Sequence, residues 1–169
     1  REFVGKLVAG KGDELPVSAC SEDGTIPVGS TQWEKRNISF TVPVWEPDLC
    51  IQCGKCVFVC PHAVVRAKIV EPELAGAPEG FKMMPAKFKE FAGKNYTIQV
   101  SAADCTGCEL CAQACPTKDK SNASRKAINM AQRPEDRTQE TALWNYFLSL
   151  PDIEPHHSDV RFNSVKNIQ

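Results

Sequence analysis

Eight of the nine cysteines fall in two short runs that share one spacing. The runs are Cys50, Cys53, Cys56 and Cys60, followed by Cys105, Cys108, Cys111 and Cys115. Each run reads C-x2-C-x2-C-x3-C-P, and each cysteine of the second run lies 55 positions after its counterpart in the first. A constant offset over so many positions indicates an internal duplication. The ninth cysteine, Cys20, belongs to neither run, and the sequence suggests no role for it.

Three chemistries could use cysteines in such numbers. A disulfide framework requires an oxidising compartment, and nothing in this sequence points to secretion. Structural zinc usually takes separated pairs of ligands, which is not the pattern here. The C-x2-C-x2-C-x3-C-P run is the bacterial ferredoxin signature for two 4Fe-4S clusters, in which the fourth cysteine ligates the other cluster. The spacing therefore favours two 4Fe-4S clusters, with zinc and disulfides as the alternatives.

The crossed arrangement assigns every cysteine of both runs to a cluster. Cluster 1 is predicted to be held by Cys50, Cys53, Cys56 and Cys115. Cluster 2 is predicted to be held by Cys105, Cys108, Cys111 and Cys60. Cysteines three residues apart let one loop hold three corners of a cluster, and the crossed fourth ligand ties the two halves into one body. The sequence shows no set of residues for independent catalysis, so no catalytic residue is predicted.

The pattern along the chain predicts an α+β fold of the bacterial two-cluster ferredoxin type, (βαβ)2 with pseudo-twofold symmetry. Residues 1–43 are expected to form an extended arm, and residues 44–133 the ferredoxin-like domain with an insertion at about 71–94. Short strands are predicted at 41–45, 68–70, 95–101 and 125–130, and a short helix at 62–67. Residues 134–169 are expected to form a helix and a linker, with Pro134 opening the helix and Pro151 ending it.

The residues between the ligands differ in the two runs. Ile51, Val57, Phe58 and Val59 fill the first run, whereas the second is filled by smaller or more polar residues and carries Glu109. Because water and nearby charge tune the potential of a cluster, cluster 1 is expected to be the drier of the two. Glu109 is expected to lower the potential of cluster 2. Trp45, five residues before Cys50, is expected to pack against the first ligand loop.

Composition excludes several other functions. The formal net charge is −1, which gives no reason to expect a nucleic-acid partner. No run of 18 apolar residues is present, so no membrane span is predicted. The chain begins at Arg1 without an initiator methionine. We therefore expect it to be a fragment of a longer protein.

Several motifs outside the cysteines carry a closer resemblance. They are GDELPVSA at 12–19, DGT at 23–25, WEKR at 33–36, VWEPD at 44–48, CPHA at 60–63, DCTGC at 104–108, CPTKDK at 115–120 and SRKAINM at 124–130. Together they resemble the pyruvate:ferredoxin (flavodoxin) oxidoreductase family over about residues 10–155. Within that family the chain is similar to the inserted two-cluster domain with its flanking segments.

The resemblance implies an electron-transfer role inside a homodimeric, cytoplasmic enzyme, or an organellar one in a eukaryote. Thiamine diphosphate and a third 4Fe-4S cluster would lie on other parts of that enzyme, and ferredoxin or flavodoxin would accept the electrons. Two basic segments, residues 81–95 and 117–133, could attract such acidic carriers. The alternatives are a ferredoxin-like subunit of another redox complex and a zinc-stabilised interaction module.

Overall fold

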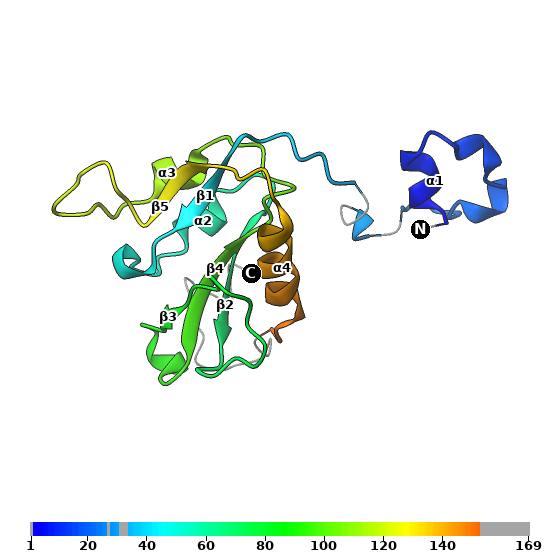
Figure 1. Ribbon diagram of the computed structural model, residues 1–169. Coiled ribbons are helices and arrows are strands. Elements are labelled where there is room, and N and C mark those ends of the chain that lie inside the picture. The colour runs from blue at the N-terminus through cyan, green and yellow to red at the C-terminus, as the bar shows by residue number, and fades with distance from the viewer. Residues whose placement is uncertain (1, 27, 31–33, 153–169) are drawn as a thin grey trace. The chain divides into compact units, whose positions relative to one another are not determined.

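The structure is a computed structural model that describes residues 2–26, 28–30 and 34–152. It divides into two compact units, Arg1–Arg36 and Asn37–Gln169. The expected helix-free linker at 153–169 lies outside the described residues. Figure 1 shows the elements of each unit. In the described part of the chain, no helix has the length and apolar character that crossing a bilayer requires.

The first unit contains helical turns where an extended arm was expected. They are α1 (Val4–Val8), η1 (Gly12–Glu14) and η2 (Val17–Ala19). The Lys11 amide donates to the Lys6 carbonyl at 2.8 Å and closes the end of α1. The expectation of an extended conformation is therefore wrong for these segments, because short local hydrogen bonds form helical turns without a periodic apolar face. Cys20 follows η2 and is exposed.

The second unit is built on two small antiparallel sheets. In the first, β1 (Thr41–Trp45) pairs with β5 (Ile128–Gln132), with Trp45 opposite Ile128. In the second, β4 (Asn95–Val100) lies between β2 (Val65–Val70) and the short β3 (Met84–Pro85). Strands from one half of the duplication therefore pair with strands from the other half, which holds the two halves together.

The strand predictions hold best next to the ligand loops. The strands predicted at 41–45 and 95–101 are confirmed by β1 and β4. The helix predicted at 62–67 is wrong, because residues 65–70 form β2 and pair with β4 along its whole length. Ala63 instead has a left-handed backbone, with φ of 50°, in the turn before the strand. Cross-strand hydrogen bonds and burial on both faces decide this conformation, and neither is visible in the local sequence.

Two short helices follow the ligand loops at equivalent places in the duplication. They are α2 (Lys55–Phe58) and α3 (Leu110–Ala114), which contain the third cysteines of the two runs. A single turn, η4 (Pro47–Leu49), leads into the first ligand loop. The repeated sequence thus gives repeated local structure around the cysteines.

The insertion packs onto this core. Its one helical turn is η5 (Lys89–Phe91). Phe91 is buried, and the Phe88 ring lies 6.3 Å from both the Phe91 ring and the Tyr96 ring. The insertion therefore adds an aromatic layer beside β4.

The C-terminal helix, α4 (Thr138–Ser149), lies beside β4 in Figure 1. It begins four residues after Pro134, where the Asp136 carboxylate accepts the Thr138 amide at 2.9 Å. The Phe147 side chain on this helix is fully buried. The buried Lys68 ammonium donates to the Leu150 carbonyl at 2.6 Å and so ties the end of α4 to β2.

Candidate iron-sulfur centres

The two ligand loops share an unusual backbone. Gln52 and Gly54 in the first loop have φ of 59° and 70°, and their counterparts Gly107 and Glu109 have φ of 71° and 64°. These left-handed residues wrap each loop around its first cysteine. The Gln52 amide lies 3.3 Å from the Cys50 sulfur, and the Gly107 amide lies 3.4 Å from the Cys105 sulfur. Each loop therefore points an N–H donor at the sulfur of its first cysteine.

The eight cysteines show one pattern of exposure in both runs. The first and third cysteines of each run are buried, the second is exposed and the fourth is intermediate. The buried members are Cys50, Cys56, Cys105 and Cys111. Each fourth thiol also has a nearby donor, since the Val64 amide lies 3.4 Å from the Cys60 sulfur and the Thr117 hydroxyl 3.3 Å from the Cys115 sulfur.

Four of these thiols line a single cavity. They are Cys50, Cys53, Cys56 and Cys115, the set assigned to cluster 1. Trp45 and Tyr96 line the same space, which we call the thiol cavity. The structure thus brings the last cysteine of the second run to the first three cysteines of the first run. For the other set, burial raises the pKa of Cys105 and of Cys111, and repulsion from Cys60 adds to both shifts.

Burial makes the inner thiols weak acids on their own. It raises the pKa of Cys56 to about 12 and that of Cys111 to about 11, and neighbouring thiols add to both shifts. For Cys115, burial also acts to raise the pKa, but hydrogen bonds from Thr117 and nearby amides outweigh it and lower the value. Thiols with pKa values raised in this way stay protonated at neutral pH unless a metal ligates and deprotonates them.

The donor set fits an iron-sulfur cluster. In the described parts of the chain, no three Cys, His, Asp or Glu side chains are placed to hold one metal ion. The four thiols surround a cavity instead, with a backbone amide directed at the sulfur of Cys50. Sulfur-only ligands around a shared space, with amide donors to sulfur, are the chemistry of a 4Fe-4S site.

Two of the apolar residues between the ligands of the first run do not shield the thiols from water. Ile51 and Phe58, expected to exclude water from cluster 1, are 53% and 75% exposed. Their side chains point away from the core because the cysteines occupy the inward positions of the loop and of α2. That cluster 1 is the drier of the two stays a prediction. Trp45 does pack against the loop as expected, with 4% of its surface exposed. Tyr96 was not predicted as a site residue, because it lies on β4 and far from the first run in sequence.

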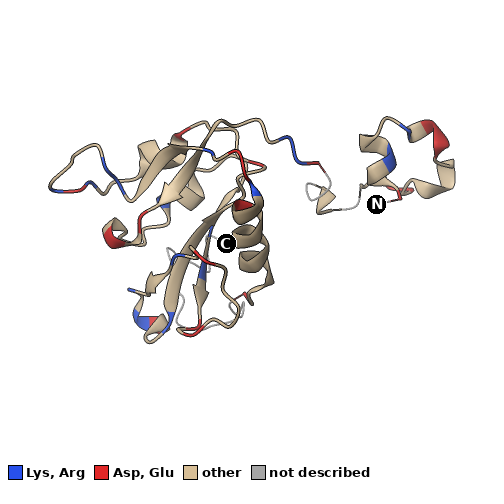
Figure 2. Cartoon of the chain, in the orientation of Figure 1, with Lys and Arg blue, Asp and Glu red and all other residues tan. Residues whose placement is uncertain are grey.

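Most of the cationic side chains in the two basic segments, residues 81–95 and 117–133, already bond to other groups of the second unit. Figure 2 shows the charged residues of this unit. Lys87 donates to the Cys50 carbonyl at 2.8 Å, and Lys126 donates to the Ala112 carbonyl at 2.7 Å. Arg125 pairs with Glu46, Asp48 and Asp119, and Arg133 is buried against Glu140. These cations hold the ligand loops and α3 in place. In the described chain, Lys89, Lys118 and Lys120 have no side-chain partner and are exposed.

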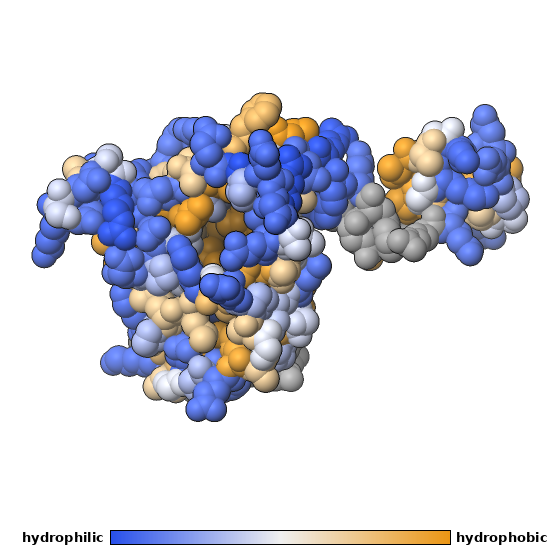
Figure 3. All heavy atoms as spheres, in the orientation of Figure 1, coloured by the Kyte–Doolittle hydropathy of each residue, from blue (hydrophilic) through white to orange (hydrophobic). Residues whose placement is uncertain are grey.

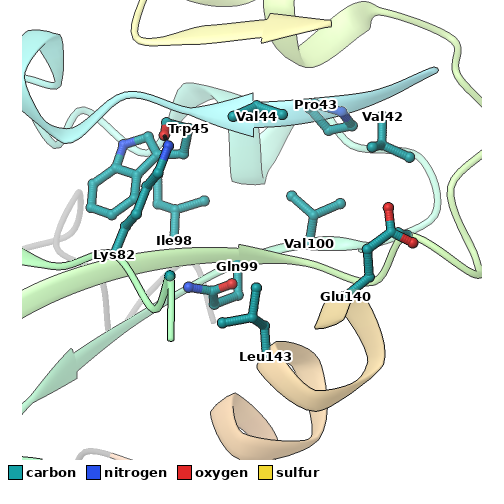
Figure 4. Close-up of a pocket in the computed structure, with 12 residues that line it drawn as sticks. Val42, Pro43, Val44, Trp45, Lys82, Ile98, Gln99, Val100, Glu140 and Leu143 are labelled. Atoms are coloured by element: carbon teal, nitrogen blue, oxygen red, sulfur yellow. Dashed lines mark hydrogen bonds between the residues drawn. The ribbon is translucent and has the colours of Figure 1, made fainter. Parts of the chain in front are cut away.

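A second cavity of about 170 Å³ lies between β1 and β4, beside α4 (Figure 4). Figure 3 shows apolar surface in a hollow on the face that carries these elements. Two charged residues line this cavity, and both already have hydrogen-bond partners. Lys82 donates to the Trp45 carbonyl, and Glu140 accepts a hydrogen bond from Arg133. Bonded charges and an apolar lining make this cavity part of the packing rather than a reaction site.

Comparison with known proteins agrees with this geometry. Residues 49–118 match a family model described as a 4Fe-4S dicluster domain, and residues 1–39 match one described as a domain of unknown function. A putative pyruvate-flavodoxin oxidoreductase of Synechocystis is 50% identical over 100% of this chain. The chain is homologous to one segment of the pyruvate-flavodoxin oxidoreductases. It spans 14% of the length of that relative.

Other relatives extend the comparison. The pyruvate:ferredoxin oxidoreductase of Moorella thermoacetica is 46% identical over 99% of this chain, which covers 14% of that protein. The pyruvate dehydrogenase (NADP+) of Cryptosporidium parvum is 40% identical over 90% of this chain, which covers 8% of it. The resemblance seen in the sequence is thus confirmed, and the match to a 4Fe-4S dicluster domain supports the predicted iron-sulfur clusters. The ligand set of each cluster stays a prediction.

Proposed function

We propose that this chain is the electron-transfer segment of a pyruvate, or more broadly 2-oxoacid, oxidoreductase. It relays electrons through two 4Fe-4S clusters to ferredoxin or flavodoxin. The observation that carries the proposal is the thiol cavity, because it joins cysteines from both runs within a dicluster domain. Two clusters in one small domain make a relay, since each accepts and passes on one electron.

The proposed ligands are the crossed sets predicted from the spacing. Cys50, Cys53, Cys56 and Cys115 hold cluster 1, and Cys105, Cys108, Cys111 and Cys60 hold cluster 2. Support comes from the equal burial pattern of the two runs and from the thiol cavity, where Cys115 meets the first three cysteines of the first run. The matching left-handed loop residues and the short helices α2 and α3 support a pseudo-twofold arrangement of the two halves.

The chain's own residues prepare each site for a cluster. The amides of Gln52 and Gly107 favour negative charge on sulfur, and the Val64 amide does the same at Cys60. Gln52 also holds the insertion against the first loop, since its side chain donates to the Pro85 carbonyl and accepts the Lys87 amide. These contacts fix the loop before the cluster binds, so little rearrangement accompanies electron transfer.

In this proposal the chemistry of pyruvate lies elsewhere in the parent enzyme. Oxidation of pyruvate with coenzyme A would give acetyl-CoA, carbon dioxide, one proton and two electrons, with thiamine diphosphate bound by another domain. The electrons would reach this chain one at a time from a third, proximal 4Fe-4S cluster held elsewhere in that enzyme. The parent enzyme is proposed to be a homodimer in the cytoplasm, or in an organelle of a eukaryote.

The acceptor is proposed to dock through a narrower set of cations than the sequence indicated. Lys118 and Lys120 are exposed in the loop before β5, and Lys89 is exposed in the insertion. Their charges are available to an acidic carrier, whereas those of Arg125 and Arg133 are used internally. Electrostatic attraction of this kind raises the association rate and weakens with salt.

The test is anaerobic purification of the chain followed by metal and sulfide analysis. The proposal expects a brown protein with about eight iron and eight sulfide per chain, whose reduced form transfers electrons to flavodoxin. A variant that combines Cys56→Ser and Cys111→Ser is the control, because it removes one buried ligand from each cluster. A colourless protein that binds zinc, or a two-cluster protein that reduces neither ferredoxin nor flavodoxin, would contradict the proposal.

A further inference from the structure

Two buried hydrogen-bond donors at the thiol cavity have no partner. Trp45 is 4% exposed and Tyr96 is fully buried. Neither the indole Nε1 of Trp45 nor the hydroxyl of Tyr96 finds a hydrogen-bond partner among the described residues. Burying an unpaired polar group is unfavourable, so each one in a folded protein needs a reason. Both side chains line the thiol cavity, and their rings meet edge-on with centroids 6.0 Å apart.

Both donors lie beside the sulfurs of the first run. Trp45 and Tyr96 line the thiol cavity together with Cys50, Cys53 and Cys56, and neither the indole Nε1 nor the hydroxyl completes a hydrogen bond there with a described residue. A phenol hydroxyl carries its proton at neutral pH, so Tyr96 acts as a donor.

We propose that the Trp45 Nε1–H and the Tyr96 O–H donate hydrogen bonds to sulfur atoms of cluster 1 and raise its reduction potential above that of cluster 2. The inference rests on the proposed function, because it requires a cluster in the thiol cavity. Reduction adds one electron to the cluster and increases the negative charge on its sulfurs. Donors aimed at those sulfurs bind the reduced form more strongly, and this shifts the potential upward.

The duplication shows why the effect belongs to one cluster. The two halves of the duplication are offset by 55 positions, so Val100 is the equivalent of Trp45 and Thr41 is the equivalent of Tyr96. Val100 has no side-chain donor. Thr41 is only partly buried, so its hydroxyl can bond to water, and its carbonyl lies near Gly107 in the second ligand loop. The second site thus lacks both aromatic donors at the equivalent positions.

The experiment is a redox titration of the cluster-loaded chain monitored by EPR. The test variants are Tyr96→Phe, which removes only the hydroxyl, and Trp45→Phe, which removes the N–H. Matched controls remove the same groups elsewhere: Tyr146→Phe, whose hydroxyl bonds to the Ala75 carbonyl at 3.0 Å, and Trp144→Phe on α4. The signal of cluster 1 is identified as the one perturbed in a Cys53→Ser variant.

Each test variant should shift the one-electron equilibrium of cluster 1 toward the oxidised form by about threefold to tenfold. This corresponds to a reduction potential that is lower by roughly 30–60 mV. The potential of cluster 2 should not move, and neither control should move either potential. The inference is overturned if two clusters form but Tyr96→Phe leaves both potentials unchanged or shifts them equally. Absence of clusters in the parent chain would instead overturn the proposed function as well. If Trp45→Phe fails to retain iron, Tyr96→Phe decides the question alone.

Discussion

Replacing Gly107 with alanine should destabilise the second ligand loop through two separable effects. Gly107 has φ of +71°, and a Cβ there would lie 2.5 Å from the Ser39 hydroxyl and 3.5 Å from the Thr41 carbonyl. The left-handed backbone costs an alanine about 1–2 kcal/mol. Moving the buried Ser39, which donates to the Thr41 carbonyl, adds about 1–3 kcal/mol, as overpacking does elsewhere. The expected loss for Gly107→Ala is therefore about 2–5 kcal/mol.

A matched glycine isolates the contact with Ser39. Gly93 has φ of +84°, and a Cβ added there would have no atom within 4 Å, so Gly93→Ala should lose only about 1–2 kcal/mol. Adding Ser39→Ala to Gly107→Ala removes the clashing hydroxyl and should recover part of the loss in a double-mutant cycle. Anaerobic urea denaturation followed by circular dichroism measures all four variants. The reasoning is refuted if Gly107→Ala loses no more than Gly93→Ala and Ser39→Ala shows no coupling to it.

Two further changes test other parts of the second unit by the same denaturation. Glu109→Gly should stabilise the chain by about 1 kcal/mol, because Glu109 is left-handed where the duplicate position holds Gly54; an unchanged midpoint would contradict this. Lys68→Met should lose about 1–3 kcal/mol, because it leaves the Leu150 carbonyl without its buried donor. Lys94→Met breaks only an exposed ion pair and should lose less than about 0.5 kcal/mol, so equal losses for both lysines would refute the role given to Lys68.

The sequence located the ligand loops because their chemistry is local. The spacing of cysteines predicts where each loop turns, and β1 and β4 begin where the alternating residues indicated. The segment from His62 was misassigned because its composition suits a short helix. Only pairing with β4 makes residues 65–70 a strand. Pairing of this kind depends on residues about 30 positions away, and a local pattern does not contain that information.

The same limit applies to the site. Trp45 was predicted to pack beside Cys50 because the two are near in sequence, and it does so. Tyr96 was missed because it reaches the thiol cavity from the other half of the duplication. The charge counts of the basic segments also overstated the number of cations available to a partner. A count cannot distinguish Arg125, which pairs with three carboxylates, from Lys120, which is exposed. Contacts between distant segments decide these roles.

The central claim is that the two runs exchange their fourth ligands, and four single variants test it by EPR. Cys115→Ser should perturb the same cluster signal as Cys53→Ser, because both cysteines line the thiol cavity. Cys60→Ser should perturb the other signal, together with Cys108→Ser. The account predicts this crossed pairing. If Cys115→Ser instead perturbs the signal lost in Cys108→Ser, each run holds its own cluster, and the crossed account is contradicted.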